Sequence, residues 1–129
     1  MEKQEQKEKI EGWIRKIRDS GKIIIVEGQK DKASLISVCI NKESIITLNR
    51  NKALYSIAEE VAETGKDAII LTDFDKKGKE LYGKMKKELA RAGVNIDLQY
   101  REFLQKNTKL SHIEGLQRYL GNIRKEIHK

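Results

Sequence analysis

Four short apolar runs, separated by helical patterns, constrain the fold of this chain more than any other feature. The first three, at residues 23–26, 44–48 and 68–71, are near-continuous runs rich in isoleucine and other apolar residues. Such runs are typical of parallel strands that are covered on both faces. The fourth run, at residues 94–98, alternates apolar and polar residues and predicts an edge strand with one wetter face. The alternation predicts an α/β fold with a four-stranded, mainly parallel sheet.

Helical patterns lie between these runs and at both ends of the chain. Three connecting helices are predicted from apolar residues at helical spacing: Ala33, Ile36 and Ile40 in residues 31–40; Ala53, Leu54, Ile57, Ala58 and Val61, with Asn51 as a candidate cap; and Leu81, Tyr82, Met85 and Leu89. An N-terminal helix over about 3–19 buries Ile10, Trp13, Ile14 and Ile17 and stops before Gly21. A C-terminal helical extension spans about 100–127, and its last helix begins at the capping-box pattern Ser111–Glu114 and carries Ile113, Leu116, Leu120 and Ile123.

Length and composition favour one charged globular domain over residues 1–129. The longest apolar runs fall far short of the ~20 residues that cross a bilayer, and the charged N-terminus lacks a signal-peptide core, so we expect a cytoplasmic protein. The net charge of +7 is compatible with a polyanionic partner. Richness in lysine and glutamate is typical of thermophilic proteins.

The single cysteine and the two histidines are predicted to have no role in a site. One cysteine excludes an internal disulfide and a cysteine-based metal cage. Cys39 lies in the apolar stretch LISVCI and is predicted to be a small buried side chain. We expect His112 and His128 to be surface residues far from the acidic residues considered next.

Acidic residues follow two of the predicted strands directly. Glu27 comes after the first strand, and Asp73 and Asp75 come after the third. In a parallel sheet of order two-one-three-four, these three carboxylates meet at the carboxyl ends of neighbouring strands, where ligands bind in such folds. They repel one another unless they are protonated or a cation neutralises them. The pattern therefore predicts a Mg²⁺ site, with Mn²⁺ as a substitute, although Asp75 by itself is also an ordinary helix cap.

Glycines and basic residues surround the same crevice. Gly28 and Gly78 lack side chains at the two turns and would let a phosphate approach the backbone. Arg50, Lys76 and Lys77 are placed to contact phosphates. A phosphate or a strand of nucleic acid could therefore approach this crevice.

These motifs resemble the TOPRIM domain of topoisomerases, bacterial-type primases and several nucleases. The run from Ile23 to Gly28, followed by Asp31, resembles the first TOPRIM motif, and the run from Leu71 to Gly78 resembles the D-x-D-x-x-G of primases and of the nuclease that matures 5S ribosomal RNA. The resemblance covers about residues 22–98. More narrowly, the chain is similar to small stand-alone TOPRIM proteins of archaea and some bacteria, a likeness that residues 111–116 share.

The resemblance implies Mg²⁺ held by Asp73 and Asp75, with Glu27 as general acid/base or as a further metal ligand. Lys77 stands where some members carry a third acidic residue. The nucleophile domain of topoisomerases, the zinc module of primases and the extra domain of the 5S-maturing nuclease have no counterpart here. We therefore expect a Mg²⁺-dependent RNA nuclease or a related phosphodiester-transfer enzyme.

Three other readings are open from the sequence. The first is a TOPRIM-like scaffold that binds nucleic acid or a ribonucleoprotein without turnover. The second, a phosphoacceptor receiver domain, fits poorly because such domains carry paired acids after the first strand and one aspartate after the third. The third, a haloacid-dehalogenase-type phosphatase, has its D-x-D after the first strand and is also a poor fit.

Overall fold

The computed structural model describes residues 3–48 and 51–127, with side chains up to residue 122. The predicted α/β class is confirmed: three parallel strands are flanked by six α-helices in this described part of the chain. The elements in chain order are α1 (Lys3–Asp19), β1 (Ile23–Val26), α2 (Gln29–Ser37), η1 (Lys42–Ser44), β2 (Ile45–Thr47), α3 (Leu54–Glu63), β3 (Ala68–Ile70), α4 (Lys76–Arg91), α5 (Gln99–Asn107), η2 (Ile113–Gly115) and α6 (Leu116–Ile127).

The sheet has the order β2-β1-β3, and both pairings are parallel. Ile24 of the central strand β1 is paired with Ile45 of β2 on one side and with Ile69 of β3 on the other. The order predicted for the first three strands is therefore confirmed. It places the carboxyl ends of β1 and β3 next to each other.

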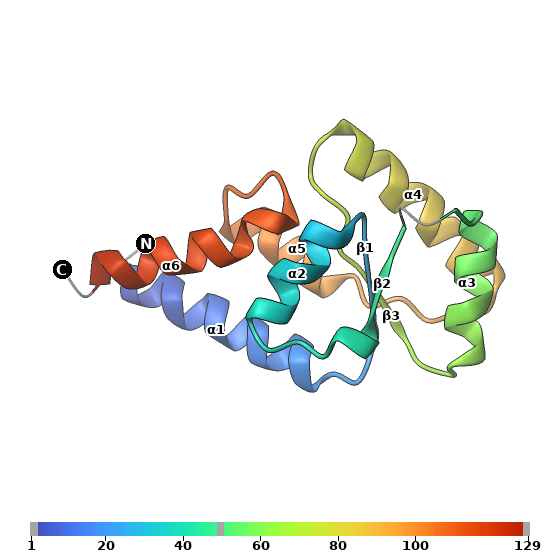
Figure 1. The fold of residues 1–129 in the computed structure, drawn as a ribbon, viewed down its shortest axis with the longest axis horizontal. Coiled ribbons are helices and arrows are strands. Elements are labelled where there is room, and N and C mark those ends of the chain that lie inside the picture. Colours follow the sequence, from blue (N-terminus) through green and yellow to red (C-terminus); the bar gives the residue numbers. More distant parts are fainter. Residues whose placement is uncertain (1–2, 49–50, 128–129) are drawn as a thin grey trace.

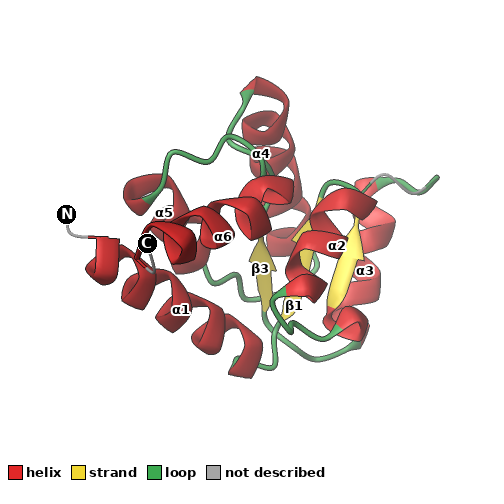
Figure 2. Cartoon of the chain, turned by 60° about the vertical axis from the view of Figure 1, so that its left-hand side comes forward, coloured by secondary structure: helices red, strands yellow, loops and turns green. Residues whose placement is uncertain are grey.

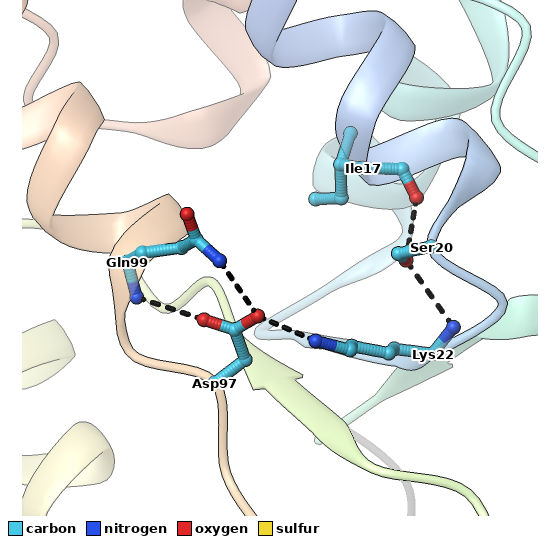
Figure 3. A network of polar contacts seen from close by, with 5 residues as sticks. All are labelled: Ile17, Ser20, Lys22, Asp97 and Gln99. Carbon is cyan, nitrogen blue, oxygen red and sulfur yellow. Dashed lines mark hydrogen bonds and ion pairs between the residues drawn. The ribbon is translucent and has the colours of Figure 1, made fainter.

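The predicted fourth strand is not a strand. Residues 94–98 make one isolated parallel bridge, between Ile96 and Ala68. The chain leaves the sheet at Asp97, whose carboxylate accepts hydrogen bonds from the backbone and side-chain nitrogens of Gln99 at 3.1 and 3.0 Å, at the start of α5. The same carboxylate lies 2.6 Å from Lys22 Nζ, in the connection between α1 and β1 (Figure 3). These bonds hold Asp97 at the helix start, so the ladder ends after one bridge.

Both faces of the sheet are covered, as the continuous apolar runs predict. On one face, Ile24 and Val26 pack with residues of α1, α2, α5 and α6. On the other face, Ile23 and Ile25 pack with residues of α3 and α4. Figure 1 shows α3 and α4 on one side of the strands, and Figure 2 shows α1, α5 and α6 gathered on the opposite side. Alternate residues of β1 thus pack into two separate hydrophobic cores, one on each face of the sheet.

The helices at the two ends of the chain pack against each other and onto the same core. The four predicted apolar residues of α1, from Ile10 to Ile17, are all buried. Trp13 Nε1 donates a 3.0 Å hydrogen bond to the Tyr100 carbonyl in α5, and the two rings meet edge to face. Gly21, just after α1, has a φ of +70° as predicted for a helix stop. In the described residues, we find no helix with the length and apolar content that a bilayer span requires.

The buried face predicted for the second helix is wrong. Ala33 and Ile36 are exposed, whereas Leu35, Ser34 and Asp31 are buried. Ile40 is buried as predicted, but it lies beyond the end of α2 at Ser37. The prediction followed isoleucine and alanine spacing in a helix with only a weak apolar pattern. Contacts with η2 and α6 select the other face, which is a tertiary effect.

Two predicted caps and one predicted burial are also wrong. The N-cap of α3 is Ala53 and not Asn51, and it makes no side-chain capping bond. The Ser111 pattern leads first into the 3-10 turn η2, and α6 begins only at Leu116. Cys39 is exposed and has a φ of +71°, because the chain reverses there after α2 ends.

Candidate metal centre

Glu27 and Asp73 meet at the carboxyl ends of β1 and β3, which are neighbours in the sheet (Figure 1). Glu27 follows the last residue of β1, and its Oε2 accepts a 2.7 Å hydrogen bond from the backbone N–H of Asp73. The contact joins residues 46 positions apart. The structure thus brings these two predicted site residues together, with Glu27 positioning the D-x-D loop.

Asp75 has two partners, one for each carboxylate oxygen. Its Oδ1 accepts a 2.8 Å hydrogen bond from the backbone N–H of Gly78, so Asp75 is the N-cap of α4. Its Oδ2 lies 3.3 Å from Nε2 of His112. The ordinary capping role is therefore present, and the second oxygen remains directed at another side chain.

The prediction that His112 lies far from the aspartates is wrong. Residues 111–113 lie along the D-x-D loop: the N–H of Phe74 donates to the Ser111 carbonyl at 2.9 Å, and the N–H of Ile113 donates to Asp73 Oδ1 at 2.7 Å. As a result, one potential ligand atom from each of Asp73, Asp75 and His112 lies within 4.8 Å of the other two. The other histidine, His128, lies outside the described residues.

The electrostatics of this cluster disfavour negative charge on Asp73. Asp73 is only 7% exposed. Burial, followed by the charges of Asp31 and Glu27, raises the pKa of Asp73 from 3.8 to about 6. The hydrogen bond from the Ile113 amide and the charge of His112 oppose this increase. Burial also raises the pKa of Asp31, although the Gly28 amide opposes this. A cation at this position would remove the repulsion and replace the lost hydration.

Arg101, in α5, is a buried residue that holds the D-x-D loop and that sequence reasoning missed. Its Nε donates to the Thr72 carbonyl at 3.0 Å, and one terminal nitrogen donates to the Asp73 carbonyl at 2.7 Å. The guanidinium also lies over the rings of Phe74 and Tyr82, at 4.7 and 4.5 Å. Burial lowers its pKa, while Tyr82 and Asp73 oppose that effect. In the sequence, the signal for this burial is that Arg101 lies three residues before Leu104, on the same face of a helix.

Gly78 is required by packing within the loop. A Cβ at this position would lie 2.0 Å from the carbonyl oxygen of Asp73. The same turn is closed by Thr72, whose hydroxyl donates to the Gly78 carbonyl at 2.8 Å. Gly28 has extended backbone, and its N–H donates to Asp31 Oδ2 at 3.0 Å. That a phosphate approaches either glycine stays a prediction.

The predicted basic residues fall into two groups. Lys76 and Lys77 are exposed in the first turn of α4. Lys77 lines a shallow pocket that also exposes Glu27, Asp73, His112 and a further lysine, Lys30. Arg50 lies outside the described residues. Acidic and basic side chains therefore share one pocket.

Curated relatives of the chain belong to one family. No protein-family model matches the chain. A UPF0292 protein of Thermoplasma volcanium is 38% identical over 93 residues, which cover 72% of this chain and 77% of that protein. A UPF0292 protein of Thermococcus sibiricus is 34% identical over 116 residues, or 88% of this chain and 86% of that protein. A solved structure of an Aquifex aeolicus protein matches with a TM-score of 0.72 and 30% identity, over 80% of this chain and 94% of that one. The chain belongs to the UPF0292 protein family.

Proposed function

We propose that this protein is a divalent-metal-dependent enzyme that cleaves phosphodiester bonds of RNA, with Mg²⁺ or Mn²⁺ as its cofactor and a TOPRIM-like core. The observation that carries the proposal is that Asp73 lies beside both Glu27, from a motif 46 positions away, and Asp75. The hydrogen bond from Asp73 N–H to Glu27 supports it, because this bond aligns the two motifs on neighbouring strands.

The residues at this site fit a hard divalent cation. Asp73 and Asp75 would hold it, because oxygen ligands suit Mg²⁺ and Mn²⁺. A cation there would also offset the burial and the nearby carboxylates that raise the pKa of Asp73. When bound, such a cation polarises a phosphoryl oxygen and stabilises the charge that develops during cleavage.

The protein side chains supply positioning and proton transfer. Glu27 uses Oε2 to hold the Asp73 amide, and its Oε1 is the proposed site of proton transfer to or from the attacking or leaving oxygen. Lys77 and Lys30 line the same pocket and would contact phosphates beside the bond to be cut. Lys76 lies next to Lys77, and we extend the same role to it and to Arg50.

The direct test is cleavage of structured RNAs in the presence of Mg²⁺ or Mn²⁺. Asp75→Asn should abolish cleavage and leave RNA affinity largely unchanged, because asparagine still caps α4 but loses the charge. Glu63→Gln, at the exposed end of α3, is the matched control and should cleave like the wild type. Cleavage by Asp75→Asn at the wild-type rate would contradict the mechanism.

The metal is tested separately by Mn²⁺ binding. We expect saturable binding to the wild type and its loss in the Asp73→Asn/Asp75→Asn double variant, with Glu59→Gln/Glu63→Gln, at two exposed positions of α3, as the charge-matched control. The double variant keeps both acceptor oxygens for Ile113 and Gly78, so circular dichroism should show an unchanged fold. Equal Mn²⁺ affinity in both proteins would remove the metal from the proposal.

Binding of nucleic acid without turnover is the second candidate, and the state of Glu27 favours it. One oxygen of this carboxylate is engaged in a structural bond, as expected of a residue that only maintains the fold. A scaffold of this kind would bind RNA with steep salt dependence and would keep binding it in the presence of a chelator. RNA binding that needs the divalent ion would argue against the scaffold.

A further inference from the structure

We propose that His112 is a third ligand of the cation and makes the site prefer first-row transition-metal ions, including Mn²⁺, over Mg²⁺. The inference rests on the proposed metal site and adds an imidazole nitrogen to it. It concerns a residue that the sequence pattern placed far from the aspartates.

The spacing of the donor atoms supports a shared ion. Two ligands at right angles on a cation about 2.1 Å away lie about 3 Å apart. His112 Nε2 and Asp75 Oδ2 are separated by 3.3 Å, and the set that includes Asp73 spans no more than 4.8 Å. Small movements of exposed side chains would therefore bring all three donors onto one ion.

The backbone on both sides of His112 is bound to the D-x-D loop. Ser111 accepts the bond from Phe74 N–H through its carbonyl, and Ile113 donates its N–H to the Asp73 carboxylate. His112 lies between these two anchors and is itself about half exposed, with a side-chain exposure of 46%. Its ring is therefore brought beside the aspartates by fixed backbone while remaining accessible to an ion from solution.

The hydroxyl of Ser111 can select the ring tautomer that binds metal. Ser111 Oγ lies 2.9 Å from Nδ1 of His112. When Nδ1–H donates to this oxygen, Nε2 carries a lone pair that faces the Asp75 carboxylate. Two such acceptors repel at 3.3 Å unless a cation lies between them. Without the cation, the other tautomer satisfies both contacts, with Nε2–H donating to Asp75 and the Ser111 hydroxyl donating to Nδ1. A hydrogen-bonded second nitrogen is the usual arrangement of a histidine ligand.

The ligand set decides the metal preference. An all-oxygen site suits Mg²⁺. An imidazole nitrogen instead favours divalent ions of the first transition series, whose affinity for such a site rises from Mn²⁺ to Cu²⁺. A site with two carboxylates and one imidazole should therefore bind Mn²⁺ more tightly than Mg²⁺. Removing the imidazole should reduce that difference.

The experiment is electron spin-echo spectroscopy of the Mn²⁺-loaded full chain, which detects nitrogen bound directly to Mn²⁺. The sequence contains only two histidines, so protein labelled with ¹⁵N-histidine has two candidate sources of the signal. We expect a directly bound ¹⁵N in the wild type, its loss in His112→Ala and its retention in His128→Ala, the matched control. Mn²⁺ affinity should fall about tenfold or more in His112→Ala, while Mg²⁺ affinity changes less than about threefold.

The outcomes separate this inference from the proposed function. Mn²⁺ that binds through Asp73 and Asp75 but shows no coupled nitrogen would overturn the role of His112 and leave the metal site intact. Retention of the nitrogen signal in His112→Ala would also overturn it. If Mn²⁺ does not bind the wild type at all, both the inference and the metal part of the proposed function are wrong.

Discussion

The two turns that follow β1 and β3 have similar sequences and are held in different ways. Each runs from a strand through an acidic residue into a helix, and each contains a glycine. In the β1–α2 turn, the hydrogen bond that Asp31 accepts from Gly28 N–H is local. The β3–α4 turn has a local bond of the opposite sense, from the N–H of Gly78 in the helix to the carboxylate of the N-cap Asp75, and it is also held by three distant segments. These segments are Glu27, Arg101 and residues 111–113, which act through the Ser111 carbonyl and the Ile113 N–H.

The difference shows what a D-x-D loop needs beyond its own sequence. The start of α2 is held by fewer bonds: the local one from Gly28 to Asp31, and a backbone interaction of Glu114 with the same carboxylate. A loop that presents two carboxylates close together must also overcome their repulsion and the burial of Asp73. Bonds from three other segments over-determine its backbone, as expected where unfavourable charges are retained for a function. Breaking these supports one at a time tests the comparison.

The largest expected effect is that of Gly78→Ala. The new Cβ would overlap the carbonyl of Asp73, which is backbone and cannot rotate away. We expect the free energy of unfolding to fall by about 4 kcal/mol or more, measured by urea denaturation. Gly83→Ala is the control in the same helix: its Cβ has open space around it, so it should raise stability by up to about 1 kcal/mol. Equal effects at the two glycines would contradict the close approach.

The next effect is that of Arg101→Met, which keeps the apolar stem and removes the guanidinium. The carbonyls of Thr72 and Asp73 then lose their partner, and we expect a loss of about 3 kcal/mol in unfolding free energy. Mn²⁺ affinity should also fall, because the loop that carries the aspartates loses a support. Unchanged stability and affinity would show that the local capping bond alone holds the loop.

A smaller effect is expected from pH on the metal-free protein. The folded pKa of Asp73, about 6, lies above its ordinary value of 3.8. The folded state therefore holds a proton that the unfolded state releases, and stability should fall by roughly 2 kcal/mol as the pH rises from about 4 to about 6. Asp73→Asn should remove this fall, which thermal denaturation in a chelator would measure.

Asp97→Asn is the control for the pH dependence, because the pKa of Asp97 is shifted in the opposite direction. Burial raises the pKa of Asp97, but the hydrogen bonds from Lys22 and Gln99 lower this pKa by more, so the net shift is downward. Its contribution to stability is present above its ordinary pKa and is lost as the pH falls. Asp97→Asn should therefore leave the fall between pH 4 and 6 in place. If Asp97→Asn removed the fall in stability between pH 4 and 6, that fall would come from Asp97 and not from Asp73.

The smallest effect separates the two roles of Asp75. Asp75→Ala removes the cap of α4 and should lower stability by about 1 kcal/mol, whereas Asp75→Asn should leave stability nearly unchanged. Both variants should lose Mn²⁺ binding, since neither has the carboxylate. Binding retained by Asp75→Asn would limit Asp75 to a capping role. Calorimetric titration and urea denaturation of the two variants measure these effects.

The regular parts of the fold were predictable from short-range patterns. The isoleucine runs of β1 and β3 identify strands that are buried on both faces, and Ile10, Trp13, Ile14 and Ile17 identify the buried side of α1. The predictions failed where local preference is weak. The buried face of α2 and the end of the sheet at Asp97 depend on contacts with segments distant in sequence.

For the candidate site, the sequence by itself determined which acidic residues follow β1 and β3, because parallel pairing of neighbouring strands brings their carboxyl ends together. Tertiary structure alone decided that His112 lies beside Asp75 and that Arg101 holds the Asp73 backbone. Both come from the segment after α4, whose path depends on packing against the sheet and against α1 and α2. Hydrophobic periodicity records which face of an element is buried, but not which distant polar side chain that burial brings to the site.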